Sequence, residues 1–95
     1  MAVRVIIERV VDPDRELVLQ HKLVELRAKA MQSRGYISGE TLRSVNNPQK
    51  FLVISTWASL NDWKSWENNP ERKRLQKEID VLLKAPANVE IYAYA

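Results

Sequence analysis

Three side chains in this 95-residue sequence, Trp66, Asp62 and Arg27, have types and positions that could act on a small aromatic molecule. The indole of Trp66 has a flat surface that can stack on a planar ring and an N–H that can donate to a developing oxyanion. Asp62 precedes Trp66 by four residues, so a helix would place both on one side, and Asp62 is the best candidate for a carboxylate base. Arg27 carries a permanent positive charge that would stabilise a phenolate and lower the pKa of the phenol. We therefore predict Trp66, Arg27 and Asp62 as catalytic residues.

Each of these residues also has a structural interpretation, which the sequence leaves open. Trp66 could be a core tryptophan, and Arg27 could extend its charged end to solvent from an apolar helix face. Asp62, like the nearby Asn68 and Asn69, could serve only to cap or end a helix, which is the commoner role of such residues.

Three further residues are expected to line the substrate pocket. Leu23 and Leu26 share the helix face of Arg27 and would form an apolar wall. Trp63 lies three residues before Trp66, so a helix would bring the two indoles to one side.

The composition excludes several kinds of site. The sequence has no cysteine and one histidine, His21, so we expect neither a disulfide framework nor a metal site. No Walker loop, GxGxxG, GxSxG or HExxH motif occurs, so nothing favours a nucleotide-binding protein, a hydrolase of that type or a zinc protease. With 45% apolar and 28% charged residues the sequence is typical of a globular protein, and its length has room for one domain, residues 1–95.

Basic residues are in excess, with a net charge of +3, but they are dispersed among acidic residues. The densest group, Arg72, Lys73 and Arg74, is flanked by Glu71 and Glu78, and we interpret it as a solvated helix face. We therefore expect no nucleic-acid or membrane partner. The N-terminal residues lead directly into a strand pattern and no window reaches 18 apolar residues, so we expect a cytoplasmic protein.

Periodicity and turn residues predict seven elements in the order strand, helix, strand, strand, helix, helix, strand. They are expected at residues 3–11, 15–34, 36–45, 51–57, 60–68, 70–84 and 89–94. The second and third strands are joined by turn residues and should form an antiparallel hairpin.

The long helix at 15–34 is expected to carry two neighbouring apolar stripes. The first consists of Leu19, Leu23, Leu26 and Ala30, and the second of Leu17, Val24, Ala28 and Met31. Arg27 falls between the stripes and therefore among apolar neighbours. Asp12 or Asp14 should cap the start of the helix, and Gly35 should follow its last turn as a C-cap.

The order of elements matches an α+β, ferredoxin-like split βαβ fold with a four-stranded antiparallel sheet. Helices cover one face of such a sheet, yet the strands at 3–11 and 51–57 are apolar on both faces. The uncovered face would expose an apolar patch unless a second copy packs on it, so we expect a homodimer.

The resemblance to a known family is carried by the order of elements, the strand ending in Thr56-Trp57, and the segment SLNDWKSWENNP at residues 59–70. In these features the chain resembles the antibiotic biosynthesis monooxygenase family, over nearly its whole length. The resemblance implies a dimeric α+β barrel, in which two sheets pack face to face and each subunit has one pocket between sheet and helices. It also implies chemistry on small molecules, since the family includes cofactor-free oxygenases of phenols and quinols as well as haem-degrading oxygenases.

The haem-degrading branch is not favoured by the residues. Its members resemble one another in an Asn on the first strand, a Trp on the short helix and a His nine or ten residues after that Trp. Here Trp66 fits, but Ile7 occupies the strand position and Leu75 and Gln76 occupy the position of the axial ligand. His21 lies on a different predicted helix.

The sequence therefore predicts a monooxygenase that uses O2 on a small aromatic phenol or quinol without a cofactor, because an electron-rich substrate anion can itself pass an electron to oxygen. The protein would bind, desolvate and orient that anion. Two alternatives stay open: a ligand-binding dimer of the same fold without catalytic activity, and a haem-binding relative.

Overall fold

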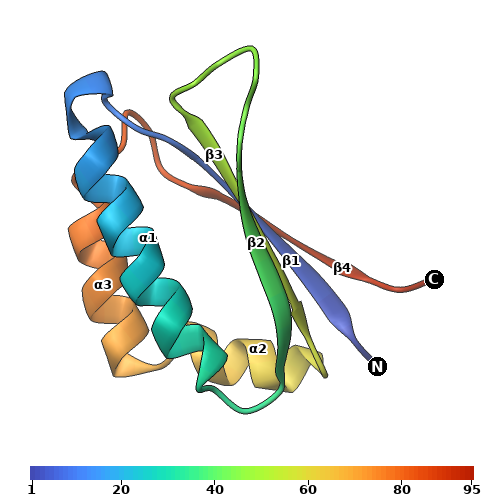
Figure 1. The fold of residues 1–95 in the computed structure, drawn as a ribbon. Helices are drawn as coiled ribbons and strands as arrows, with labels where there is room; N and C mark the ends of the chain where they lie inside the picture. The colour runs from blue at the N-terminus through green and yellow to red at the C-terminus, as the bar shows by residue number, and fades with distance from the viewer.

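The apolar and β-branched segments pair into one antiparallel sheet, and the amphipathic segments form helices on one side of it (Figure 1). The computed structural model describes all 95 residues, Met1–Ala95. Its elements are β1 (Val3–Val10), α1 (Glu16–Met31), β2 (Tyr36–Arg43), β3 (Lys50–Trp57), α2 (Leu60–Glu67), α3 (Pro70–Asp80) and β4 (Asn88–Ala93), with a short 3-10 turn at Pro13–Arg15 before α1. None of the helices has the length and apolar character needed to cross a membrane.

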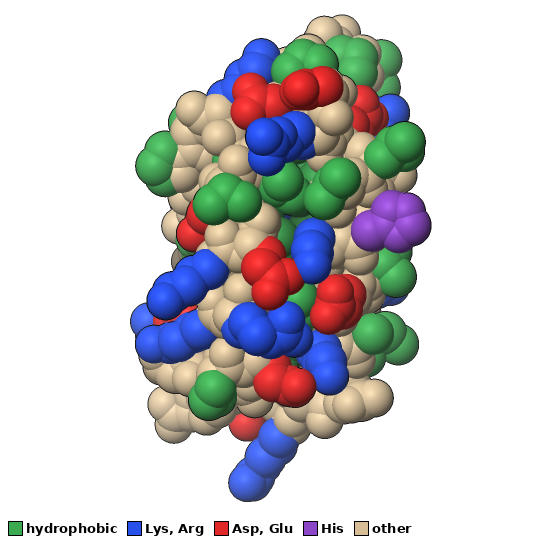
Figure 2. Space-filling view, turned by 90° about the vertical axis from the view of Figure 1, so that its left-hand side faces the viewer, with side chains coloured by type: hydrophobic (Ala, Val, Ile, Leu, Met, Phe, Trp, Pro, Cys, Tyr) green, Lys and Arg blue, Asp and Glu red, His purple; other side chains and the backbone are tan.

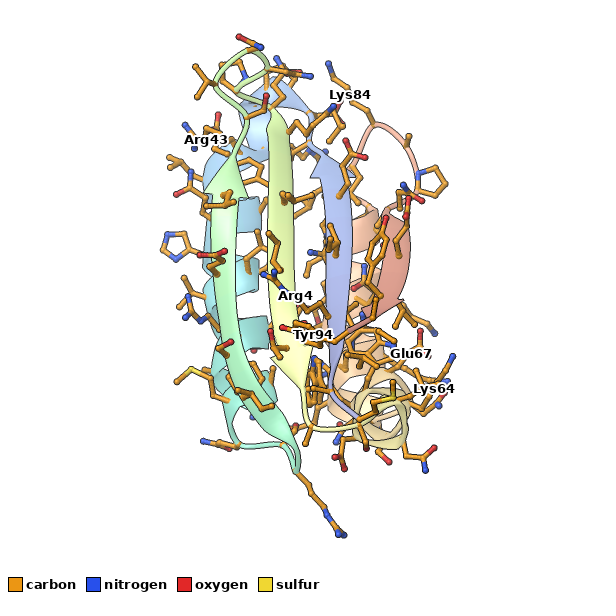
Figure 3. All side chains as sticks on the ribbon, turned by 90° about the vertical axis from the view of Figure 1, so that its right-hand side faces the viewer. Arg4, Arg43, Lys64, Glu67, Lys84 and Tyr94 are labelled. Atoms are coloured by element: carbon orange, nitrogen blue, oxygen red, sulfur yellow. The ribbon has the colours of Figure 1, made fainter.

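The sheet has the strand order β2-β3-β1-β4, and every neighbouring pair is antiparallel. The predicted ferredoxin-like α+β fold is therefore confirmed. In the register of β1 and β3, Ile7 lies opposite Val53 and Arg9 opposite Phe51 on the side that faces the helices. Ile6 lies opposite Ile54 on the other side. We call this second side the open face, because α1 and α3 lie behind the sheet when it is viewed from there (Figure 3).

The core lies between the sheet and the helices. It contains the first predicted stripe of α1, Leu19, Leu23, Leu26 and Ala30, which is buried as expected. The second stripe is exposed: Leu17 and Val24 each keep 72% of their surface in solvent. The reason is that α1 turns one side to the sheet and one flank to α3, which leaves its remaining side uncovered.

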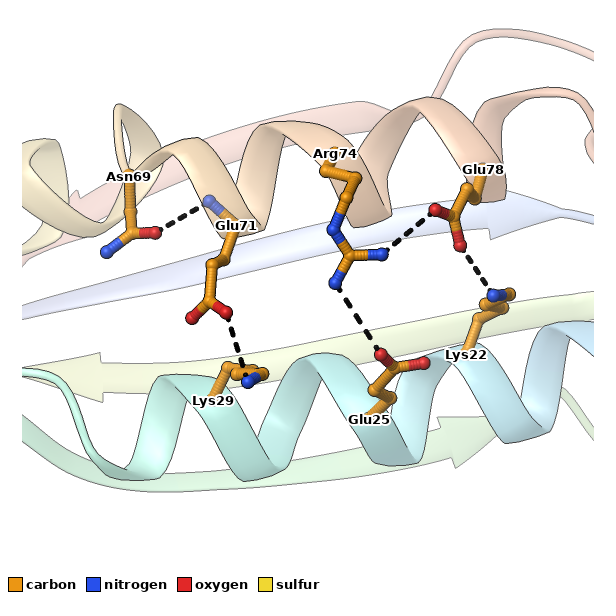
Figure 4. Close-up of polar contacts among 7 residues, drawn as sticks. All are labelled: Lys22, Glu25, Lys29, Asn69, Glu71, Arg74 and Glu78. Carbon is orange, nitrogen blue, oxygen red and sulfur yellow. Dashed lines mark hydrogen bonds and ion pairs between the residues drawn. The ribbon is translucent and has the colours of Figure 1, made fainter.

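Ion pairs join α1 to the neighbouring α3 along their exposed flanks (Figure 4). Lys22 pairs with Glu78 at 2.5 Å, and Arg74 bonds to Glu78 at 3.0 Å. Further along, Lys29 pairs with Glu71 and Arg74 approaches Glu25. Seen from the helix side, basic and acidic side chains accordingly alternate along the middle of the surface (Figure 2). Such exposed pairs orient the helices but stabilise them only weakly.

The end of α3 differs from the prediction. The helix stops at Asp80 and not near residue 84, because Leu83 forms an isolated β-bridge with Val11 and the amide of Lys84 donates to the carbonyl of Val10. The chain is thereby drawn beside the end of β1 before it enters β4.

The predicted caps of α1 also need correction. Neither Asp12 nor Asp14 caps this helix, and Arg15 at the N-cap position makes no side-chain cap bond. Gly35 lies three residues beyond the C-cap residue Gln32, so it is not the cap itself. It has a positive φ of 83°, which favours glycine.

Candidate active site

Helix α2 brings two indoles to the core beneath β3. Its first turn is held by Ser59, whose Oγ accepts from the backbone N–H of Asp62 at 3.1 Å. Trp63 and Trp66, three residues apart, then face inward against Trp57 at the end of β3. The Trp66 ring stacks on Trp57 with a centroid separation of 6.4 Å, and the Trp63 ring meets it edge-on at 5.8 Å. This aromatic cluster forms one end of a cavity.

The cavity lies between α1, α2, α3 and the helix-facing side of β1, β2 and β3; we call it the central cavity. Its walls are mostly apolar, and about 50 Å³ of it is available to the centres of water molecules. That is room for about four waters, or roughly 120 Å³ of liquid, which is close to the size of a cavity that accepts one benzene ring. This space therefore matches a single aromatic ring.

Five of the six predicted site residues lie together on the wall of the central cavity. They are Leu23, Leu26, Arg27, Trp63 and Trp66. The four hydrophobic ones all come from the expected faces of α1 and α2. The structure places both indoles at the cavity.

Arg27 lies at the mouth of the central cavity and remains exposed to solvent. Its Nη2 donates to the carbonyl oxygen of Gly39 on β2 at 2.6 Å, so the side chain spans from α1 to the sheet. Both interpretations of Arg27 thus hold in part: the residue lines the cavity, and its charged end reaches water.

Asp62 is the predicted residue that the structure does not bring to the cavity. Its Oδ2 accepts from the Ser59 hydroxyl at 2.9 Å, which belongs to the N-terminal cap of α2. The same side chain occupies the space next to Gly35, where any Cβ would collide with it. The capping interpretation describes Asp62 in this structure, and the position of its carboxylate gives no support to a role as base in the cavity.

Two arginines that the sequence interpretation missed, Arg9 and Arg72, also line the central cavity. Arg9 is 1% exposed and Arg72 is 8% exposed. The interpretation of Arg72 as part of a solvated helix face was wrong. A signal was present, since Arg72 lies three residues before the buried Leu75 and Arg9 continues the alternation of buried residues on β1.

Burial dominates the electrostatics of these two side chains. It lowers the pKa of Arg9 to about 10, with a further lowering from the nearby charge of Arg72 and a partial compensation by Asp80. Burial also lowers the pKa of Arg72, against the opposing effects of Glu67 and Asp80. Both guanidinium groups are therefore still cationic at neutral pH but are poorly solvated.

Several donors around the cavity have no acceptor. The buried Nε and Nη1 of Arg9 and the buried indole N–H of Trp63 make no hydrogen bond. By contrast, the indole N–H of Trp57 donates to Ser55 Oγ at 3.0 Å. Buried donors without partners are uncommon, and they mark a place where an acceptor would be favourable.

The positions that would hold haem in the haem-degrading branch do not suit it here. Ile7 lines the central cavity with an apolar side chain, Leu75 is fully buried in the core, and Gln76 accepts from Arg9 at 3.0 Å. None of the three is an imidazole or another usual axial donor to iron.

Comparison with known proteins places this geometry in a family. The model of the antibiotic biosynthesis monooxygenase family matches residues 2–78. The chain belongs to the antibiotic biosynthesis monooxygenase family. A search of curated proteins found no match.

Solved structures share the fold of this family member at low sequence identity. Rv0793 from Mycobacterium tuberculosis has a TM-score of 0.92 and 18% identity, covering 100% of this chain and 96% of its own. A conserved protein from Methanosarcina mazei Go1 has a TM-score of 0.92 and 16% identity, covering 97% of this chain and 91% of its own. SnoaB, a cofactor-independent oxygenase from Streptomyces nogalater, has a TM-score of 0.86 and 11% identity, covering 99% of this chain and 93% of its own. At these identities the likeness extends to the fold alone.

Proposed function

We propose that this protein is a cofactor-independent monooxygenase that oxidises a small aromatic phenol or quinol with O2 in the central cavity. The observation that carries this proposal is the cavity itself, where apolar side chains, indoles and arginines, among them Arg27, line a space the size of one ring. Membership in a monooxygenase family and the fold shared with SnoaB support it.

The reaction can balance without an added reductant. The phenol loses its proton, and the phenolate transfers an electron to O2 to give a radical pair that combines at a ring carbon that bears hydrogen, which is para to the oxygen in a simple phenol and ortho to it in a quinol. The resulting hydroperoxide loses water to give a quinone. One oxygen atom of O2 then ends in the product and the other in water, and the four electrons come from the substrate.

The side chains have distinct tasks in this proposal. Leu23 and Leu26 exclude water from the ring, so the phenolate is more easily oxidised than in solution. Arg27 stabilises the phenolate at the mouth, where its proton can leave to solvent. Trp66 supports the ring by stacking and donates to charge that forms on oxygen.

We also propose that the active form is a homodimer joined through the open faces of two sheets. Ile6 and Ile54 form a cross-strand pair in the middle of that face, and Leu52 lies on it beside Leu42 of β2. No helix lies in front of this face of the sheet (Figure 3). Charged residues such as Arg4 and Glu8 lie on it too, and the uncovered apolar side chains among them favour pairing with a second copy.

Oxygen uptake by metal-stripped protein tests the proposed function. Hydroquinones, naphthols and anthrones provide a panel of increasing size, and the cavity volume predicts the fastest turnover for the single-ring compounds. Trp66→Phe and Arg27→Gln should each slow turnover by roughly one to two powers of ten, as expected for a desolvated hydrogen bond of about 1.5 to 3 kcal/mol. Arg34→Gln removes an equal charge at an exposed position after α1 and should have no effect.

Two results would count against the proposal. If both site variants stay folded and oxidise the best substrate at the parent rate, the site assignment is wrong. If no compound is consumed faster than in buffer, while ligands still bind, the protein is a binding module of the same fold.

A further inference from the structure

Two cationic side chains are buried at the central cavity without an anionic partner. Neither Arg9 nor Arg72 forms an ion pair with a carboxylate, although the surface of the same molecule has several such pairs. Burying a charge without pairing it costs far more than burying an apolar group of the same size. Two such charges at one cavity therefore point to a function that offsets their cost in stability.

The contacts that hold Arg9 in place leave most of its donors free. Nη2 donates to Oε1 of Gln76 at 3.0 Å, and Nε2 of Gln76 donates in turn to Asp80 at 2.8 Å. Gln76 is neutral, so its bond orients the guanidinium, and Asp80 at the end of this chain of bonds compensates the charge of Arg9 only in part. Nε and Nη1 stay without acceptors.

Arg72 is positioned by a contact with Trp63. Its guanidinium carbon lies 5.1 Å from the centre of the Trp63 ring, an attractive cation–π arrangement. The indole N–H of the same Trp63 is buried and has no acceptor. Arg9 of β1 and Trp63 of α2, which have donors without acceptors, and the second cation Arg72 of α3 therefore line the same, mostly apolar cavity.

We propose that Arg9, Arg72 and the indole N–H of Trp63 form a subsite for a carboxylate, so that the ligand of the central cavity is a small aromatic carboxylic acid. The ring lies against the apolar walls, and the carboxylate oxygens accept from the unpaired donors. This neutralises part of the buried charge, and guanidinium groups match carboxylates well because they can donate two parallel hydrogen bonds.

The size of the space favours a carboxylate over a phosphate. The cavity holds about one ring, and a planar carboxylate adds little to the thickness of an arene, whereas a phosphate is tetrahedral and bulkier. Ile7 and Arg72 also line a second, solvent-open groove between α3 and β4, whose charged lining includes Lys84 as well as Glu67 and Asp80, so Arg72 borders both spaces.

This inference depends on the proposed function only in taking the bound acid to be the substrate; binding of the acid requires no turnover. If the acid binds through the arginines but no phenolic acid consumes oxygen, the subsite stands and the oxygenase proposal fails. If quinols are oxidised equally well with and without a carboxyl group, the oxygenase proposal stands and the subsite fails.

The test is calorimetric binding under nitrogen of 2,5-dihydroxybenzoate and of its neutral match, 2,5-dihydroxybenzamide, with phenyl phosphate as a third probe. We expect the acid to bind at least tenfold more tightly than the amide and than phenyl phosphate. Arg9→Gln and Arg72→Gln should each weaken the binding of the acid about tenfold or more and leave the affinity for the amide unchanged. Arg72→Lys should recover part of the lost affinity for the acid. Lys73 is an exposed neighbour of Arg72 with the same charge, and Lys73→Gln should change the affinity for neither the acid nor the amide.

Unchanged amide binding shows that a variant has kept its cavity, so a folding defect is distinguishable from loss of the subsite. Equal affinity for acid and amide in the parent protein would overturn the proposal. So would tighter binding of phenyl phosphate than of the acid, or a loss of acid binding in Lys73→Gln as large as in Arg72→Gln.

Discussion

At the scale of single residues, the central cavity combines apolar walls with buried arginines, whose desolvated charge reduces the stability of the fold. Arg9 is less exposed than Leu23 and Leu26 of the same cavity, so its charge has lost most of its hydration. Residues that reduce stability and line a cavity are typically kept for binding or catalysis. Stability and ligand affinity should therefore respond in opposite directions when Arg9 is replaced.

Arg9→Met tests this opposition. Methionine fills a similar elongated space without charge, so the ligand-free protein should gain about 1 kcal/mol, which for a chain of this length raises Tm by roughly 4 to 8 °C. Lys73→Met, which removes an exposed charge, should leave Tm almost unchanged. Thermal unfolding followed by circular dichroism gives both values. A marked fall in Tm for Arg9→Met would mean that its bond to Gln76 is a structural requirement of the fold.

Sequence reasoning located the apolar and aromatic lining of the site but not its charges. Helical spacing was sufficient for Leu23, Leu26 and Trp66, because amphipathic helices turn such residues inward. Arg9 and Arg72 occupy buried positions of the same patterns, yet arginine is nearly always exposed, and that general tendency outweighed the periodicity. Asp62 shares a side with Trp66 as predicted, but its carboxylate is held by Ser59, a contact that spacing alone does not specify.

At the scale of elements, the connection from α1 to β2 fixes how closely α2 approaches the sheet. The positive φ of Gly35 turns the chain, its carbonyl accepts from the amide of Ala58 at 2.7 Å, and its missing side chain leaves room for Asp62. The glycine thereby helps to position α2 and, with it, the indoles of the site.

Gly35→Ala should accordingly destabilise the protein by more than 1 to 2 kcal/mol, roughly the cost of a left-handed conformation alone, because the new methyl group also collides with Asp62. Gly39→Ala is the matched control, since its φ is ordinary and its nearest neighbour is the movable hydroxyl end of Tyr36. Urea unfolding would measure both. Equal losses in the two variants would show that the conformation of Gly35 is not the cause.

The ion pairs between α1 and α3 make a pH-dependent contribution. The hydrogen bond from Lys22 lowers the pKa of Glu78 below its ordinary value of 4.5. The folded protein therefore binds this proton less tightly than the unfolded chain, so the stabilisation is complete above pH 4.5 and is lost as the pH falls through the lowered value.

Glu78→Gln should thus have a lower Tm than the parent at pH 7, and the difference should shrink toward zero as the pH falls below about 4. High salt should reduce the difference at pH 7, because both partners are exposed. Asp14→Asn, at an exposed position before α1, should show no comparable trend. A difference in Tm that stays constant from pH 7 to pH 3 would rule out the ion pair as its source.

The boundaries of elements were less predictable than their order. The sheet and its three helices follow from alternation, turn residues and amphipathic spacing, all of which are local signals. The end of α3 depends on the bridge between Leu83 and Val11, which joins residues 72 positions apart in sequence. No local pattern contains such a contact.

At the scale of the whole molecule, the two uncovered apolar surfaces are of different kinds. The open face has the paired Ile6 and Ile54 on a four-stranded sheet, whereas Leu17 and Val24 form a narrow stripe on the solvent-facing side of α1. A sheet face is better suited to pack on a copy of itself, because two sheets can interdigitate their side chains over a large area.

Equilibrium sedimentation at micromolar concentration should therefore give twice the chain mass of 11.0 kDa. Ile54→Glu, in the middle of the open face, should give the monomer mass, and Leu17→Glu on the stripe of α1 should stay dimeric. A monodisperse parent monomer would refute the dimer, and dissociation by Leu17→Glu alone would place the interface on α1.

The fate of molecular oxygen tests the central claim most directly. Metal-stripped and flavin-free protein should be given ¹⁸O₂ and the phenol that it consumes fastest, and the quinone should be analysed by mass spectrometry together with the labelled water. The proposed reaction predicts one ¹⁸O atom in each quinone and one in each water, at a rate that Trp66→Phe reduces at least tenfold. A quinone without the label, formed together with hydrogen peroxide or at the same rate in Trp66→Phe, would contradict oxygen insertion in the central cavity.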